Sequence, residues 1–496
     1  MPPRILHYSD VENAYDTPER VGRLARAVSE RRGPDTLVAG SGDNTGPGVL
    51  SLVTEGRQSL DFFDAVGPHV ETVGNHDLDH GTDALTDLVA DAPQQWVLAN
   101  VTVEGRRYGA DAGIEPATTV SLEGATIGVV GVLDPATPEM TPGTDHLDFE
   151  DPVAAVAREC EALGNPTDGE ADYVVALAHT TDEDARRIAG ETGVDAVLAG
   201  HSHERTATTV EGTPLTRPGA SGAVAYELDL ESGAVTAHET AGAEPLPALV
   251  ESLERRLTDA GLNEVVGRVD EPLSRERAVR LAGEWRLGNF VADAYRWKTG
   301  ADVGLQNGGG IREGPPLSGD VTAADLVSCS PFEEPVVVAA VSGRELTAVA
   351  HEADGRLVEA IPDYWWGHVS GMRIDERTGE DPAGSDPDPD ERARVDGGAE
   401  GRAPDEGAET QAADGAGFDV YDVTVGGEPV DPDETYTVAM PAYLLKTDRE
   451  FPTLDRSHRR ERTDVQYEVI VDYARACGID ATLEGRVPET ADGGPR

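Results

Sequence analysis

The first half of the chain alternates short apolar runs with amphipathic segments, and this alternation most constrains the fold. The runs that read as buried strands are 5–9, 36–39, 96–99, 126–133, 173–178 and 196–199. After the first run, Thr17 and Pro18 predict the start of a helix, and Gly33 predicts its end. Strands that alternate with helices in this way predict a layered α/β fold.

Five polar clusters follow predicted strands in this half of the chain. Their candidate functional residues are Asp10 and Glu12; Asp43; Asn75, His76 and Asp79; His179; and His201 and His203. Loops at the carboxyl ends of strands commonly form ligand crevices in α/β sheets. A set of carboxylate, amide and imidazole ligands suits Mn²⁺, Zn²⁺, iron or Mg²⁺. A lone histidine or an Asp after Gly is usually structural, but five clusters in order predict a metal site.

The chain of 496 residues is long enough for more than one core. A segment rich in proline precedes a short amphipathic helix, so we expect a first domain over 1–240, a linker helix over 241–262 and a second α/β domain over 263–490. Residues 375–414 carry 14 acidic residues against 4 arginines and almost no large apolar side chains. This composition predicts a solvated acidic insertion.

The charge balance restricts the partners. Asp and Glu number 94 against 40 Lys and Arg, which gives a net charge of −54. Phosphate polymers and anionic membranes repel such a surface, so neither a nucleic-acid polymer nor a membrane is an expected partner. Salt at about 1 M would screen the self-repulsion. Since no secretory leader or membrane-spanning run is recognisable, we expect a high-salt cytoplasm; the oligomeric state is left open.

The ordered motifs resemble those of the calcineurin-like metallophosphoesterases, specifically the 5′-nucleotidase family. The match covers the blocks D-x-H, G-D, G-N-H-[DE], H and G-H-x-[HQ], with one altered position. The second half adds LGNFVADA at 287–294, NGGGIR at 307–312 and SPF at 330–332. The resemblance implies a four-layer α/β/β/α sandwich, followed by a second α/β domain that binds the nucleotide and closes over the metal site.

The resemblance also implies a dinuclear metal centre. It assigns Asp43 as the bridging ligand, with Asp10, Glu12 and His203 on one ion and Asn75, His179 and His201 on the other. His76, oriented by Asp79, is implied as the catalytic residue that assists a metal-activated hydroxide. Two divalent ions are the expected cofactors.

The altered position is Glu12, where the family has histidine. A carboxylate there makes the first site rich in oxygen, which favours Mn²⁺ (or Mg²⁺) over Zn²⁺; Mg²⁺, Zn²⁺ and Co²⁺ remain alternatives to Mn²⁺. Alternatively, Glu12 points away and Asn13 takes its place.

The second half supplies the expected nucleotide contacts. Asn307 and Arg312 match base-, ribose- or phosphate-contacting positions of the family, and Phe332 matches an aromatic that stacks on the base. Arg280 and Arg286 lie near the position of a further family arginine, but neither is in register. The family's Gly-Gly-Asp-Gly turn is absent, so the remaining candidates are Tyr443 for the second aromatic, Asp448 for the acid, Lys446 for phosphate and 364–366 for an aromatic wall.

Three functions follow in order of preference. The first is hydrolysis of nucleoside 5′-monophosphates to nucleoside and phosphate. The second keeps the chemistry but acts as a phosphodiesterase or pyrophosphatase on 2′,3′-cyclic nucleotides or nucleotide sugars. The third is a catalytically weak nucleotide-binding protein, suggested by Glu12 and by the missing glycine turn.

Overall fold

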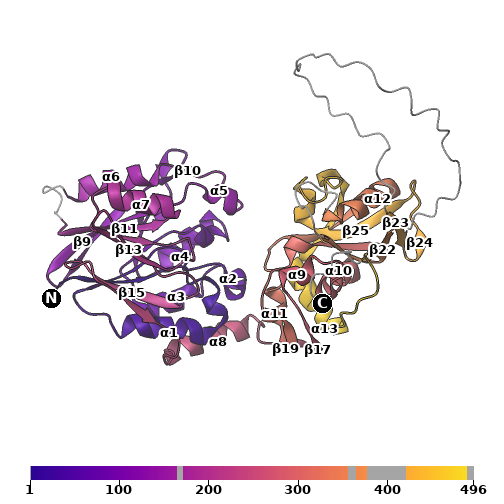
Figure 1. Ribbon diagram of the computed structural model, residues 1–496, viewed down its shortest axis with the longest axis horizontal. Coiled ribbons are helices and arrows are strands. Elements are labelled where there is room, and N and C mark those ends of the chain that lie inside the picture. The colour runs from indigo at the N-terminus through magenta and orange to yellow at the C-terminus, as the bar shows by residue number, and fades with distance from the viewer. Residues whose placement is uncertain (1, 165–170, 356–364, 377–420, 489–496) are drawn as a thin grey trace, which may run out of the picture. The chain divides into compact units, whose positions relative to one another are not determined.

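The computed structural model describes residues 2–164, 171–355, 365–376 and 421–488. The chain divides into two compact units, one comprising Met1–Val265 with Thr322–Ala324 and the other comprising Val266–Val321 with Asp325–Arg496 (Figure 1). The helix expected as a linker is α8 (Pro247–Asp259), and it packs within the first unit. The expected acidic insertion lies outside the described residues, apart from its first two, which end β22 (Met372–Glu376).

Two sheets form the centre of the first unit. One runs in the order β16 (Val235–Glu239), β15 (Val224–Asp229), β1 (Arg4–Tyr8), β2 (Thr36–Gly40), β3 (Val70–Thr72), β4 (Gln95–Val97) and β7 (Ile114–Glu115). The other runs in the order β13 (Thr206–Val210), β14 (Thr213–Arg217), β12 (Ala196–Ala199), β11 (Tyr173–His179), β9 (Ala125–Leu133) and β8 (Ala117–Leu122). All six predicted strands are therefore confirmed; β3, only three residues long, was not predicted.

Helices cover the outer faces of both sheets (Figure 1). α1 (Pro18–Ser29), α3 (Ser59–Val66) and α8 pack together on the first sheet, and α6 (Pro152–Leu163) and α7 (Asp182–Glu191) pack on the second. α1 begins at Pro18 as predicted, but it ends at Ser29 rather than at Gly33, and the Thr17 side chain makes no capping hydrogen bond. The expected four-layer α/β/β/α sandwich is confirmed.

The two sheets bury an apolar layer between them. Ile5, Leu37 and Val70 from the first sheet belong to the same core cluster as Val129 and Leu177 from the second. The sheets approach so closely that a Cβ at Gly131 would collide with the carbonyl oxygen of Val97. This packing fixes the strand ends, from which the polar loops emerge.

The second unit is built on a five-stranded sheet. Its order is β21 (Gly367–Ser370), β18 (Val303–Asn307), β25 (Thr435–Pro441), β20 (Pro335–Ser342) and β26 (Arg459–Val465). α10 (Arg286–Thr299) and α13 (Gln466–Cys477) pack together, and α10 contacts the sheet. Val303 and Leu305 lie in one core with α12 (Gly343–Glu352), whereas Gly304 lies against α10, as the alternation of a strand requires.

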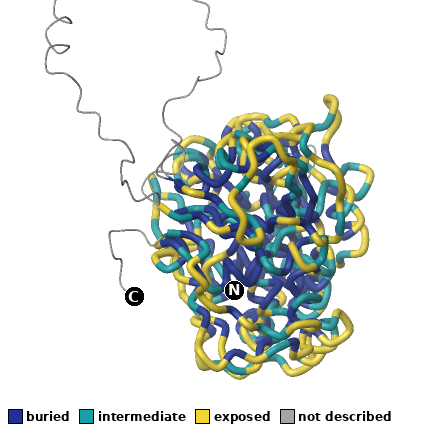
Figure 2. Tube along the Cα trace, turned by 90° about the vertical axis from the view of Figure 1, so that its right-hand side faces the viewer, coloured by how far each residue is buried: buried dark blue, intermediate teal, exposed yellow. Residues whose placement is uncertain are grey.

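Burial follows this architecture: the interior strands are mostly buried, and the exposed residues lie toward the outside of the trace (Figure 2). Among the helices in the described part of the chain, none has both the length and the apolar composition needed to cross a bilayer.

Candidate active site

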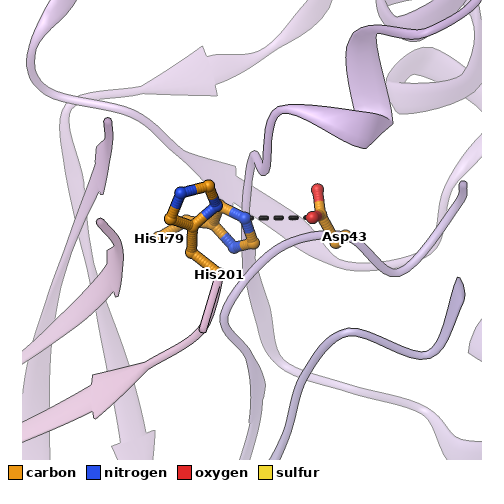
Figure 3. Close-up of side chains that lie close together, drawn as sticks. All are labelled: Asp43, His179 and His201. Carbon is orange, nitrogen blue, oxygen red and sulfur yellow. Dashed lines mark ion pairs between the residues drawn. The ribbon is translucent and has the colours of Figure 1, made fainter. Parts of the chain in front are cut away.

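The structure brings all seven predicted metal ligands together in the first unit. Two sets have ligand atoms within 4.8 Å of one another: Asp43, His179 and His201; and Asp10, Glu12 and His203. The Asn75 amide oxygen lies 3.3 Å from His179 Nε2 and 3.0 Å from His201 Nδ1. Asn75 therefore joins the set drawn in Figure 3, which is the grouping expected from the resemblance.

An ion pair lies at the centre of this set. His179 Nε2 is 3.1 Å from Asp43 Oδ2, and both side chains are buried (Figure 3). His179 Nδ1 donates to the carbonyl oxygen of Ser41 over 2.8 Å. Burial lowers the pKa of His179, but Asp43 outweighs this effect and raises the pKa to about 10. The hydrogen bond to Ser41 orients the imidazole, as an outer partner of a metal-ligating histidine does.

The ligand loops have an unusual backbone. Asp10, Glu12, Asp43 and His201 adopt φ angles of 49°, 47°, 54° and 70°. Residues other than glycine rarely occupy this left-handed region, and such conformations concentrate at functional sites. The surrounding fold therefore holds four of the seven candidate ligands in conformations that they would not adopt by preference.

Close packing explains two of the glycines in the polar clusters. A Cβ at Gly42 would lie 2.6 Å from His179 Nδ1, and one at Gly200 would lie 2.7 Å from the same atom. Both distances are too short for a side-chain carbon. These glycines therefore allow the His179 ring to reach Asp43.

The second set contains Glu12, the residue that departs from the family pattern. Glu12 is 5% exposed, and its Oε1 lies 2.8 Å from His203 Nε2. Asn13 is exposed, and its amide oxygen accepts a hydrogen bond from Ser221 over 2.9 Å. Of the two alternatives, Glu12 therefore points toward the other candidate ligands, and Asn13 does not.

The carboxylates of this set fit a bound cation. The buried Oδ2 atom of Asp10 has no hydrogen-bond partner among the described residues. Burial raises the pKa of Asp10 to about 7, opposed by His179 and assisted by the charges of Asp43 and Glu12. Burying several carboxylates together costs folding free energy unless a cation neutralises their charge. This set of donors therefore suits divalent metal ions.

His76 and Asp79 lie beside the ligands as a hydrogen-bonded pair. His76 Nδ1 is 2.9 Å from Asp79 Oδ2, and the backbone N–H of His76 donates to Asp43 Oδ1 over 2.8 Å. Burial lowers the pKa of His76, but the hydrogen bond to Asp79 and the charge of Asp43 outweigh it and raise the pKa to about 9. His76 Nε2 has no partner among the described residues, so it can meet a substrate.

Two further aspartates support the site and were not predicted. Asp77 accepts hydrogen bonds from the backbone N–H groups of Asp43 and Gly74, over 2.9 Å and 2.7 Å, and so ties two ligand loops together. Asp134 Oδ2 lies 3.6 Å from His201 Nε2. Asp134 directly follows β9, so its place after a strand was the available signal.

In the second unit, the structure gathers three side chains, those of Asn307, Trp366 and Tyr443, around the carboxylate of Glu450. These four residues are here called the Glu450 cluster. The side chains of Asn307 and Trp366 each donate to Glu450 Oε2 over 2.7 Å, and the Tyr443 hydroxyl donates to Oε1 over 3.2 Å. Glu450 was not predicted, and no motif of the chain singles it out.

Arg312 and Phe332 form a second feature of this unit. The Arg312 guanidinium carbon lies 4.7 Å from the centre of the Phe332 ring, a cation–π contact. Arg280 belongs to the same region, because its guanidinium donates to the carbonyl oxygen of Ile311 over 2.6 Å.

The structure does not bring the other candidates to the Glu450 cluster. Asp448 is exposed, and its side chain has no partner among the described residues. Arg286 donates to the carbonyl oxygen of Ala481 over 2.6 Å. Within 364–366, Trp365 is fully buried in the core, Trp366 joins the cluster, and residue 364 lies outside the described residues.

Known protein families match both halves of the chain. The family model for calcineurin-like phosphoesterases matches residues 3–205, and the model for the 5′-nucleotidase C-terminal domain matches residues 265–456. The chain is 24% identical to "Endonuclease YhcR" of Bacillus subtilis over 351 residues, which cover 64% of this chain and 28% of that protein. It is 30% identical to the 5′-nucleotidase of Bos taurus over 189 residues, which cover 37% of this chain and 32% of that protein.

The chain thus matches about a third or less of the length of these two relatives. Among solved structures, a 5′-nucleotidase precursor from Thermus thermophilus is similar, with a TM-score of 0.63, 22% identity, and coverage of 98% of this chain and 99% of the other. At that identity the similarity supports the fold. Together with the two family models, it identifies the chain as a member of the calcineurin-like phosphoesterases that continue into a 5′-nucleotidase C-terminal domain.

Proposed function

We propose that the protein is a metal-dependent phosphohydrolase that releases phosphate from nucleoside 5′-monophosphates. The observation that carries the proposal is the pair of ligand sets in the first unit, held by buried strands and by strained loops. The 5′-nucleotidase C-terminal domain supports a nucleotide as the substrate.

Two divalent ions would polarise the phosphoryl oxygens and lower the pKa of a water nucleophile. The residues proposed to hold them are Asn75, His179 and His201 for one ion, Asp10, Glu12 and His203 for the other, and Asp43 for both. Because one ion would meet three carboxylates, we propose that Mn²⁺ or Mg²⁺ is preferred over Zn²⁺. Restoring the metal-free protein with each ion tests this preference, and best activity with Zn²⁺ would contradict it.

His76 would stabilise the developing charge or protonate the leaving oxygen. Since Asp79 engages Nδ1, the other ring nitrogen is the one available to the substrate. The same carboxylate helps to keep the imidazole protonated, and therefore able to donate from Nε2. Asp79 thus acts as a positioning residue.

The second unit would recognise the nucleoside. Phe332 and the aromatic rings of the Glu450 cluster offer flat apolar surfaces for stacking on a base. Asn307 and Glu450 offer an amide and a carboxylate, which can pair with base or ribose groups. Arg312 and Arg280 add positive charge for an anionic substrate.

A second candidate function is phosphodiester cleavage. It is favoured by the alignment with Endonuclease YhcR, which extends over 351 residues of sequence. The net charge of −54 favours a small diester over a polymer.

The test is phosphate release from a substrate panel with added Mn²⁺, at low and at molar KCl. The panel includes the nucleoside 5′-monophosphates, 2′,3′-cyclic AMP, a nucleotide sugar, an aryl phosphate and an aryl phosphodiester, with His76→Ala as the matched control. We expect AMP-type monoesters to give the highest kcat/KM. Faster cleavage of the diesters would favour the second candidate, and no turnover with metal bound would contradict both.

A further inference from the structure

The second unit contains a cavity with positive walls. It measures about 290 Å³, and Ala442, Leu445, Lys446, Arg456 and Arg459 line it. Three of these five residues are cations, in a chain that has 94 acidic and 40 basic residues. The cavity therefore reverses the sign of the overall charge at one place, which favours an anionic ligand there.

The two arginines are not neutralised by the protein. The guanidinium groups of Arg456 and Arg459 are exposed, and neither has a hydrogen-bond or ion-pair partner in the part of the chain that the structure describes. Lys446 differs, because its Nζ lies 2.6 Å from Glu334 Oε1. For comparison, Arg486 in the same unit is paired with Asp293 through both terminal nitrogens. The arginines therefore offer all of their side-chain donors at the cavity, and the Lys446 ammonium keeps two N–H donors beside the one that Glu334 accepts.

Local structure holds the cations in place. Lys446 directly follows the short helix η7 (Ala442–Leu445), which continues from β25. Arg456 begins the short helix η8 (Arg456–His458), where Asp455 accepts a hydrogen bond from the N–H of Ser457 over 2.7 Å, and Arg459 is the first residue of β26. β25 and β26 both pair with β20, so the sheet fixes the segments from which the cations project.

We propose that Lys446, Arg456 and Arg459 bind a phosphate group in this cavity, in a different unit from the metal centre. A guanidinium presents a planar fork of donors that matches phosphate in a bidentate way. A cavity of this size is at the lower end for ligand sites, which suits a small anion better than a whole cofactor. The phosphate group comes either from free inorganic phosphate, the product of the proposed reaction, or from a nucleotide. The site goes beyond the proposed function and does not depend on catalysis.

The test is calorimetric titration of the full-length protein after its metals have been removed with a chelator, so that phosphate cannot bind through metal ions. The probes are inorganic phosphate, AMP, adenosine and acetate. We expect phosphate to bind and the double variant Arg456→Gln/Arg459→Gln to weaken it by at least about tenfold, because charge-assisted donors are lost. The matched control is Arg20→Gln/Arg255→Gln, which removes the same charge from exposed arginines of the first unit.

The two sources of phosphate are separated by the AMP titration. Loss of both phosphate and AMP binding assigns the site to the phosphate group of either ligand, and loss of phosphate binding alone assigns it to free phosphate. The proposal is overturned if the wild type binds no phosphate, if acetate binds as tightly, if adenosine binding falls equally, or if the control weakens binding as much. Thermal melting monitors folding, and the single variants Arg456→Gln and Arg459→Gln repeat the test if the double variant does not fold.

Discussion

The metal-ligand loops of the first unit and the Glu450 cluster of the second are built in different ways. Most candidate ligands are buried, and they lie in loops that follow the ends of strands. Four of them have a strained backbone. In the Glu450 cluster, side chains from distant segments meet on one carboxylate, and Tyr443 is 40% exposed. The first arrangement is set by the sheets and suits chemistry, which needs fixed geometry; the second depends on side-chain contacts and suits selection of a ligand.

The largest expected effect comes from removing the ligand assigned to both ions. Asp43→Asn should lower kcat/KM for AMP by more than about 10⁴-fold, because both ions would lose a ligand and the loss of even an outer partner of a metal ligand costs 10–100-fold. Metal content per chain, measured by mass spectrometry, should fall as well. Asp64→Asn, at an exposed position of the same unit, is the matched control. Retention of both ions and of activity would show that Asp43 is not a ligand.

His76→Ala separates catalysis from metal binding. We expect kcat to fall by about 10²–10⁴-fold, the usual contribution of a general acid or base, while metal content stays unchanged. His146→Ala removes an exposed histidine of the same unit and should have no effect. A loss of metal in His76→Ala would mean that the residue is a ligand.

Glu450→Gln tests the second region by itself. The substitution keeps the shape but places an amide donor among three donors, those of Asn307, Trp366 and Tyr443. KM for AMP should rise about tenfold, the cost of roughly one lost polar contact, whereas KM for an aryl phosphate should not change. Glu428→Gln, at an exposed strand residue, is the control. Equal changes for both substrates would indicate a folding role.

The smallest effect concerns stability and should change sign with the metal. Without ions, Asp10→Asn should stabilise the protein by about 1–2 kcal/mol at neutral pH, because it removes a buried carboxylate beside Asp43 and Glu12. With Mn²⁺ present, the same substitution should destabilise it, since a ligand is lost. Denaturant unfolding with and without chelator measures both. Destabilisation in both states would show that Asp10 has a structural role without the metal.

The difference between the two regions also explains what the sequence could reveal. Asp43 and His179 follow apolar runs that read as strands, and the ends of strands are where ligand loops are expected. Only the fold shows that their strands belong to two different sheets and that the two side chains meet. Glu450 lies in the irregular segment between β25 and β26, where no periodicity and no family motif marks it. Its role depends on contacts with Asn307 and Trp366, more than 80 residues away in the chain.

The same reasoning applies within the first unit. Glu12 was identified as a departure from a motif, but only the fold shows that it lies against His203 and that Asn13 turns toward Ser221. Strand β3 was missed because three residues are too few to show a period. Long, regular elements and their ends were predictable, whereas side-chain direction in loops depends on packing that the sequence does not display.

A titration of the metal-free protein with Mn²⁺, in which ion binding and phosphate release from AMP are recorded together, tests whether the centre is dinuclear. We expect turnover to appear in full only when two ions are bound per chain. Full turnover with one ion, or with none, would contradict a dinuclear centre formed by the Asp43 and Asp10 ligand sets.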